Sequence, residues 1–194
     1  MGGSALAQVY RELGAVAPDL DNAADLKNFF ALIQQLNSAG LLLAYHDRSD
    51  GGLLVTVTEM AFAGHCGVNV QMEKLLSSNQ DAVRVLFSEE AGAVIQIRHV
   101  QQTAVLQMIE QHGLSDCTRM VGTLNSRDEL RILHGGKLLF EASRVSLQRL
   151  WAQTSYEIQA MRDNPACARE EFDTLLDAGD PGLHARLSFD VNAD

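Results

Sequence analysis

Residues 46–53 read His-Asp-Arg-Ser-Asp-Gly-Gly-Leu and combine two carboxylates, a hydroxyl, a guanidinium group and a glycine pair. One apolar run, residues 41–45, leads into this segment, and a second, residues 53–63, follows it. That order predicts a strand, a polar turn and then a helix. Backbone N–H groups at a helix N-terminus attract anions, and a neighbouring carboxylate can hold Mg²⁺, which in turn bridges phosphates. The segment therefore indicates a site for Mg²⁺ and a phosphate-bearing ligand.

The same eight residues also fit an ordinary turn. Glycine adopts positive φ at little cost, and Ser49 or Asp50 could simply cap the following helix. The chain contains neither the lysine-bearing phosphate loop nor the glycine fingerprint of dinucleotide-binding proteins. Motif chemistry alone leaves both interpretations open.

The elements that must position this segment follow from the hydrophobic periodicity. It predicts helices over residues 4–13, 25–39, 52–63, 100–112, 146–162 and 167–176. It predicts strands over residues 41–45, 68–72, 93–98 and 119–123, and a hairpin from 130–133 and 137–141, whereas 81–87 is ambiguous. The unbroken apolarity of 41–45 is typical of a buried strand. Because strands and helices alternate without strict βαβ order, we expect an α+β domain whose mixed sheet is covered by helices.

Composition narrows the function. With 194 residues, 46% of them hydrophobic, the chain can bury a core as one domain with an appendage. Its net charge of −10 argues against a nucleic-acid partner, which requires a basic face. No apolar stretch is long enough for a membrane span and no signal peptide is evident, so we expect a cytoplasmic protein with no membrane partner. The three widely spaced cysteines predict neither a zinc site nor a disulfide framework.

A resemblance favours the first interpretation of residues 46–53. The string Ala44-Tyr-His-Asp-Arg-Ser-Asp-Gly-Gly-Leu-Leu-Val-Thr56, followed by Glu59-Met-Ala-Phe-Ala-Gly-His-Cys-Gly67, resembles the phosphoribosylformylglycinamidine synthases of the large, single-chain bacterial type. Residues 3–10, 87–96, 161–165 and 180–183 agree, and the resemblance runs from residue 2 to residue 194. These synthases are ATP-dependent carbon–nitrogen ligases of purine biosynthesis that convert formylglycinamide ribonucleotide to the amidine, with glutamine as amide donor.

The resemblance implies that the chain is a piece of such an enzyme, with Met1 as an added start. Residues 1–145 would form a layered α/β/α domain with a mixed sheet, like the C-terminal domain of aminoimidazole ribonucleotide synthetase. Residues 146–194 would be a helical extension and connector towards the glutaminase domain, whose nucleophile would lie beyond residue 194. The partners would be the remaining synthetase and glutaminase domains, and the chain alone would be inactive.

Site residues are also implied by the resemblance. Asp47 would ligate Mg²⁺, Ser49 would contact ATP or ADP, and Gly51 and Gly52 would allow close backbone approach. The family has two related nucleotide sites, of which one is catalytic, and this one is expected to be the structural one. No residue of the chain is therefore assigned a catalytic role.

The roles of other polar residues stay open. His46 is interpreted as a hydrogen-bonded structural histidine, whereas Arg48 could pair with a phosphate or with a carboxylate of a neighbouring domain. Glu89 and Glu90 could contact a metal or substrate, although the sequence favours a solvated pair at a turn. Residues 2–4, Gly-Gly-Ser, could cradle a phosphate or cap a helix.

Two other functions fit the same motif. One is a related ATP-using enzyme of the same structural superfamily, such as a selenophosphate synthetase or a hydrogenase maturation factor. The other is a non-catalytic nucleotide-binding or interface module.

Overall fold

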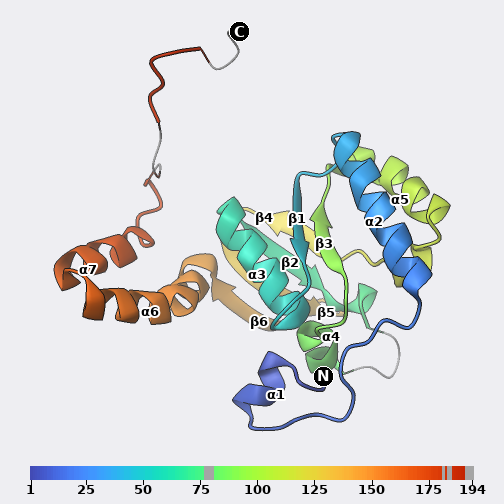
Figure 1. Cartoon of the computed structure of the whole chain (residues 1–194), viewed down its shortest axis with the longest axis horizontal. Coiled ribbons are helices and arrows are strands. Elements are labelled where there is room, and N and C mark those ends of the chain that lie inside the picture. The colour runs from blue at the N-terminus through green and yellow to red at the C-terminus, as the bar shows by residue number, and fades with distance from the viewer. Residues whose placement is uncertain (77–80, 181, 183–184, 191–194) are drawn as a thin grey trace. The chain divides into compact units, whose positions relative to one another are not determined.

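The computed structural model describes residues 1–76, 81–180, 182 and 185–190. The chain divides into two compact units, Met1–Arg144 and Val145–Asp194. The first unit contains the helices α1 (Ala5–Val9), α2 (Ala23–Ser38), α3 (Gly52–Gly64), α4 (Ala82–Phe87) and α5 (Gln102–Gln111), and the 3₁₀ turns η1 (Met72–Lys74), η2 (His99–Gln101) and η3 (Ser115–Cys117). Its strands are β1 (Ala44–Asp47), β2 (Gly67–Gln71), β3 (Ala93–Gln96), β4 (Gly122–Asn125), β5 (Glu129–His134) and β6 (Lys137–Ser143). Figure 1 shows the order of these elements.

The strands of the first unit form two sheets. β1 and β3 pair antiparallel, with Asp47 opposite Ala93. The second sheet has the order β4-β2-β5-β6, in which β2 and β5 run parallel and the other pairs run antiparallel. The predicted α+β class with a mixed sheet is therefore confirmed, although β1 and β3 stand apart from the mixed sheet. Helix α3 contacts β1 and β3 of one sheet and β2 of the other, so it lies where the two sheets meet.

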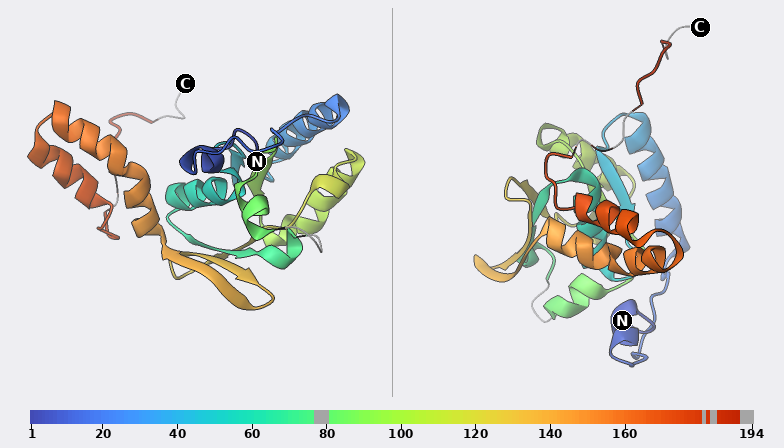
Figure 2. Two further views of the ribbon diagram at one scale, coloured as in Figure 1. Left: turned by 90° about the horizontal axis from the view of Figure 1, so that it is seen from below. Right: turned by 90° about the vertical axis from the view of Figure 1, so that its left-hand side faces the viewer.

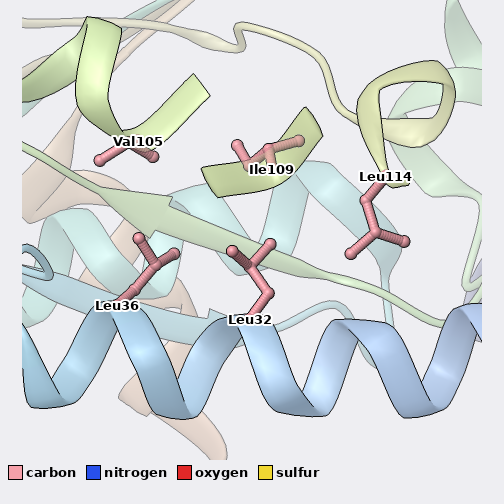
Figure 3. Close-up of a cluster of buried hydrophobic side chains, with 5 residues drawn as sticks. All are labelled: Leu32, Leu36, Val105, Ile109 and Leu114. Carbon is pink, nitrogen blue, oxygen red and sulfur yellow. The ribbon is translucent and has the colours of Figure 1, made fainter. Parts of the chain in front are cut away.

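A buried cluster joins α2 to α5 and the turn that follows α5 (Figure 3). Its members are Leu32, Leu36, Val105, Ile109 and Leu114. The apolar residues of α2 recur every three or four positions, which places them on one face of the helix. Ile95 and Ile97, in and just after β3, pack against the same cluster. The cluster therefore anchors β3, and through the β1–β3 pairing it also fixes the strand that leads to the polar segment.

Two predicted elements differ from the structure. The helix predicted over residues 4–13 ends at Val9, because Arg11 adopts a positive φ of 58° that no continuing helix allows. The buried strand predicted over residues 41–45 is wrong. β1 begins at Ala44 and its side chains alternate between half-buried and exposed, as expected for a two-stranded sheet that covers one face. The other predicted helices and strands are present with bounds shifted by a few residues, and the ambiguous residues 81–87 hold helix α4.

The predicted hairpin is confirmed. β5 and β6 pair antiparallel from Glu129 to His134, and the two residues between them, Gly135 and Gly136, both have positive φ (55° and 78°). Two consecutive positive φ values are the requirement of the tightest hairpin turns, and glycine meets it without strain.

The second unit contains a helical hairpin of α6 (Arg144–Arg162) and α7 (Pro165–Thr174), seen from two further sides in Figure 2. Asn164 caps α7 through its side chain, and Pro165 occupies the first turn, where its missing N–H costs nothing. The Arg149 guanidinium lies 3.9 Å from the centre of the Phe172 ring and donates to the Phe172 carbonyl. Tyr156 stacks on that ring at 4.5 Å, and the Arg169 guanidinium lies 5.4 Å from the centre of the Tyr156 ring. Aromatic and arginine side chains from both helices therefore hold the hairpin together. No helix among the described residues is long and apolar enough to cross a membrane.

If the α2–α5 cluster is the core, a cavity within it should lower the free energy of unfolding. Leu36→Ala should lower the free energy of unfolding by about 2–5 kcal/mol, because Leu36 is fully buried and its removal leaves a cavity. Leu26→Ala is the matched control, since Leu26 lies on the same helix and is 48% exposed. Urea denaturation followed by circular dichroism measures both losses. Equal losses for the two variants would contradict the assignment of this cluster as the core.

Candidate functional site

The polar segment forms the connection between β1 and α3, as the sequence predicts. Asp47 is the last residue of β1, Gly52 is the first residue of α3, and Gly51 occupies the N-cap position. The N-cap residue is a glycine and makes no side-chain cap hydrogen bond, so the idea that Ser49 or Asp50 caps the helix is wrong. The Gly52 N–H instead donates to the Ser49 carbonyl at 2.9 Å, which closes a tight turn. We call residues 47–52 the β1–α3 loop.

Both glycines of the loop are required by its geometry. Gly51 and Gly52 have φ values of 79° and 65°, a region that other residues enter only with strain. A Cβ atom on Gly52 would lie 2.6 Å from the carbonyl oxygen of Ser88 and 2.7 Å from the carbonyl carbon of Phe87. The start of α3 therefore packs directly on the backbone at the end of α4, with no room for a side chain between them.

Arg48 fastens the loop to the chain that follows α4. Its backbone N–H donates to the Gly92 carbonyl at 2.8 Å. Its side chain donates through Nε to the Glu90 carbonyl at 2.6 Å and through Nη2 to the Ala91 carbonyl at 3.3 Å. Within the described residues, the partners of Arg48 are thus backbone carbonyls of its own domain. A contact of Arg48 with a phosphate or with a carboxylate of a neighbouring domain stays a prediction. Arg48 holds the backbone that carries the site.

Glu89 is not the solvated residue that the sequence favoured. Its side chain is half-buried, and one oxygen atom, Oε1, accepts hydrogen bonds from the backbone N–H groups of Ala5 and Gly51, each at 2.8 Å. Glu89 thus supports the backbone of the loop, and a contact of its carboxylate with a metal or substrate stays a prediction. Glu90, in contrast, is exposed, in agreement with a solvated side chain. We call residues 88–92 the clasp segment.

Asp47 projects from the end of β1 with an exposed side chain. The Tyr45 hydroxyl donates a hydrogen bond to Asp47 Oδ1. Burial, the hydrogen bond to Asp47 and the negative charge of Asp47 together raise the pKa of Tyr45 to about 12. Tyr45 is therefore a protonated donor at neutral pH, and it fixes the orientation of the Asp47 carboxylate. Sequence analysis missed this role, although residues two apart on a strand share a face and the spacing could have revealed it.

His46 is hydrogen-bonded on both sides of its ring, which agrees with its interpretation as a structural histidine. Nδ1 lies 2.7 Å from the Asp47 carbonyl, to which it must donate, and Nε2 lies 3.0 Å from a carboxylate oxygen of Glu59 on α3. The buried Thr56 hydroxyl lies 2.9 Å from the Gly52 carbonyl and 3.3 Å from the Asp47 carbonyl. Helix α3 thus holds the end of β1 at several points.

Two polar groups of the loop are available to a ligand, the Ser49 hydroxyl and Asp47 Oδ2. The side chains of Asp47, Ser49 and Asp50 are exposed. Within the part of the chain that the structure describes, the Ser49 hydroxyl and Asp47 Oδ2 have no hydrogen-bond partner, so both can bind a ligand. No cluster of three or more metal-ligating side chains occurs among the described residues. A metal at Asp47 would therefore need water, phosphate oxygens or groups from another domain as its further ligands.

The other predicted phosphate cradle is not available. The backbone N–H groups of Gly2 and Gly3 donate to the carbonyls of Val16 and Leu13, respectively. Ser4 is fully buried and its hydroxyl accepts from the Ala7 N–H at 3.2 Å. Ordinary capping of α1, the alternative that the sequence left open, is the role of these residues.

Cys66 lies at the end of α3, beside His65. Burial raises the pKa of the Cys66 thiol, and the charge of Asp128 acts in the same direction. A reactive thiolate requires the opposite shift, so the thiol at this position is not activated.

Residues 1–135 match the model of the family described as AIR synthase related protein, C-terminal domain. The chain belongs to this family. The family domain thus includes α1, the β1–α3 loop, the clasp segment and β5.

Solved structures with the same fold come from Thermotoga maritima. PurL complexed with ATP has a TM-score of 0.57 and 19% sequence identity, and the match covers 68% of this chain and 23% of that one. Phosphoribosylformylglycinamidine synthase II has a TM-score of 0.57 and 18% identity over 65% of this chain and 22% of that one. PurL complexed with FGAR has a TM-score of 0.56 and 20% identity over 62% and 20%, respectively. The match therefore spans less than a quarter of each of these three proteins.

The packing of Gly52 on the end of α4 can be tested with a matched pair of variants. Gly52→Ala should destabilise the domain by at least about 1 kcal/mol more than Gly40→Ala, because of overpacking against backbone. Gly40 has nearly the same φ, 63° against 65°, but a Cβ atom there meets nothing within 4 Å. Gly40→Ala therefore measures the conformational strain alone. Urea titration of both variants gives the difference, and equal destabilisation would show that the close approach is absent.

Proposed function

We propose that the β1–α3 loop binds Mg²⁺ and a nucleotide, ATP or ADP. Asp47 would be a metal ligand, Ser49 would donate to a phosphate oxygen, and Gly51 and Gly52 would let the backbone approach the ligand. The observation that carries the proposal is the exposed pair of Asp47 Oδ2 and the Ser49 hydroxyl on a loop whose backbone is held from behind by Arg48 and Glu89. A carboxylate oxygen is a preferred ligand of Mg²⁺, and Mg²⁺ commonly uses one or two carboxylates together with substrate phosphates.

The charges around the loop favour a metal-bound anion over a free one. Asp47, Asp50 and Glu90 expose carboxylates near the loop, whereas the Arg48 side chain is directed to backbone carbonyls. A phosphate alone would be repelled by these carboxylates. A divalent cation reverses the local charge balance, so metal and phosphate are expected to bind together.

Tyr45 has a supporting part in this proposal. Metal-ligating carboxylates are usually hydrogen-bonded by a neighbouring group that orients them. The hydroxyl of Tyr45 does this for Asp47 Oδ1 and leaves Oδ2 directed to solvent. The carboxylate would therefore meet the metal in a fixed orientation.

We further propose that the chain is part of a phosphoribosylformylglycinamidine synthase, a ligase of purine biosynthesis that uses ATP and takes its amide nitrogen from glutamine. The family and the fold shared with PurL support this, and so do the motifs at residues 44–67. The remaining synthetase domains and the glutaminase domain would then be its partners, in the cytoplasm. In that enzyme this nucleotide site would be the structural one, and the site of chemistry would lie elsewhere.

Nucleotide binding is the first test. The purified chain should bind ADP in the presence of Mg²⁺ and much more weakly in the presence of EDTA, as measured by isothermal titration calorimetry. Asp47→Asn should weaken binding by roughly tenfold or more, because the carboxylate ligand is lost. Asp116→Asn, the same change in η3, should leave the affinity unchanged. Equal affinities for the Asp47 variant and the unsubstituted chain would rule out Asp47 as the metal ligand.

The chain alone should not catalyse the ligase reaction. With formylglycinamide ribonucleotide, ATP, Mg²⁺ and ammonia, we expect no amidine above the uncatalysed level by mass spectrometry. The physical reason is that the phosphorylated amide intermediate needs several positioned donors and metal ions at once. The described loop offers two exposed carboxylates, those of Asp47 and Asp50, and one hydroxyl. Turnover by the chain would place catalytic groups within it and overturn the structural assignment of this site.

A further inference from the structure

One oxygen atom joins two distant segments of the family domain. Oε1 of Glu89 accepts from the Ala5 N–H, at the start of α1, and from the Gly51 N–H, at the N-cap of α3. The two bonds are equal in length, 2.8 Å, and both are partly buried. Hydrogen bonds to a charged acceptor are stronger than neutral ones, particularly where water is partly excluded. Because both amides share this acceptor, a movement of either one disturbs the hydrogen bond of the other.

The segment that contains Ala5 is otherwise tied mainly to itself. The N–H groups of Gly2 and Gly3 donate to the carbonyls of Val16 and Leu13, and Ser4 bonds to Met1 and Ala7. Its outward side chains, among them Val9 and Leu13, are 77% and 85% exposed. The Ala5 amide is thus the point at which this self-contained segment, residues 1–16, is hydrogen-bonded to the clasp segment.

The segment that contains Gly51 is the loop proposed to hold the nucleotide. Gly51 lies two residues after Ser49, and its N–H points back to Glu89 rather than outward. The glutamate therefore sets the position of the backbone on which the ligand-facing groups of Ser49 and Asp47 are mounted. Through that backbone, the Glu89 carboxylate acts on the proposed ligand groups without a contact of Oε1 with the ligand.

We infer that Glu89 is a positioning residue that couples the N-terminal segment, residues 1–16, to nucleotide binding at the β1–α3 loop. The inference rests on the proposed Mg²⁺–nucleotide site. A ligand that orders the backbone at Gly51 also fixes the position of Glu89 Oε1, and a fixed acceptor favours the hydrogen bond from the Ala5 N–H. By thermodynamic reciprocity, an ordered N-terminal segment strengthens nucleotide binding by the same factor.

Three variants separate this role from a general effect of charge. Glu89→Ala removes the acceptor, whereas Glu89→Gln keeps a carbonyl oxygen that can accept both bonds and removes only the charge. Glu90→Ala is the matched control, because Glu90 is adjacent, carries the same charge and is exposed. We expect Glu89→Ala to weaken the binding of Mg²⁺–ADP roughly tenfold. Glu89→Gln should restore most of the affinity, and Glu90→Ala should match the unsubstituted chain.

Amide hydrogen exchange supplies a readout that a merely structural role would not move. Without nucleotide, exchange at both Ala5 and Gly51 should be faster in Glu89→Ala and close to normal in Glu89→Gln. Addition of Mg²⁺–ADP should slow exchange at Ala5 in the unsubstituted chain but not in Glu89→Ala. NMR with amide assignments resolves both positions, and circular dichroism verifies that each variant is folded.

The possible failures are distinguishable. If the unsubstituted chain does not bind Mg²⁺–ADP, the proposed function is overturned. The coupling is then overturned as well, even if amide exchange at Ala5 and Gly51 shows that both amides share Glu89 as acceptor. If the chain binds nucleotide but Glu89→Ala binds equally well, or Ala5 exchange ignores the nucleotide, the coupling alone is overturned. Equal loss in Glu89→Gln and Glu89→Ala would assign the effect to charge and overturn the positioning role. If Glu89→Ala does not fold, the unsubstituted chain decides the question: slower exchange at Ala5 on addition of Mg²⁺–ADP supports the coupling, and unchanged exchange overturns it.

Discussion

The antiparallel pairing of β1 with β3 is the constraint on which the rest of the site depends. Because Asp47 lies opposite Ala93, the chain that leaves β1 must run beside the chain that enters β3. The β1–α3 loop and the clasp segment are therefore neighbours, although about forty residues separate them in sequence. The contacts between the loop and the clasp segment follow from this. Arg48 donates to three backbone carbonyls, Gly52 packs on the Ser88 carbonyl, and Glu89 accepts from the Gly51 N–H. The α2–α5 core supports the pair of strands through Ile95 and so sets the whole arrangement.

Local parts of this arrangement could be predicted from the sequence. The order strand, polar turn and helix around Asp47, the helix that begins at Gly52 and the hairpin at Gly135 each depend on residues close in sequence, and each is present. The α+β class followed from the alternation of elements. The hydrogen bond of Tyr45 to Asp47 could also have been predicted, because the two residues lie only two positions apart on the same strand.

What the sequence could not provide are the contacts that depend on which strands pair. Nothing in the residues themselves indicates that β1 pairs with β3, so the partners of Arg48 and Glu89 could not be found. The same limit explains the error in β1, because the unbroken apolarity of residues 41–45 predicts a buried strand there. In the structure those residues, such as Leu41 and Leu42, pack on the α2–α5 core before the strand begins. The roles of Asp47 and Ser49 as ligand groups stay predictions, since their partners lie outside the chain.

The fastening of the loop by Arg48 has a thermodynamic consequence for any ligand. A loop that is disordered before binding must lose conformational entropy when it closes on a ligand, at a cost of about 1–2 kcal/mol for each residue fixed. Here the backbone from Arg48 to Gly52 is already held by hydrogen bonds to the clasp segment. The contacts a ligand makes with this loop are therefore converted into affinity with little loss to ordering. In the proposed nucleotide site, the arginine would contribute to recognition without touching the ligand, because it orders the loop before binding.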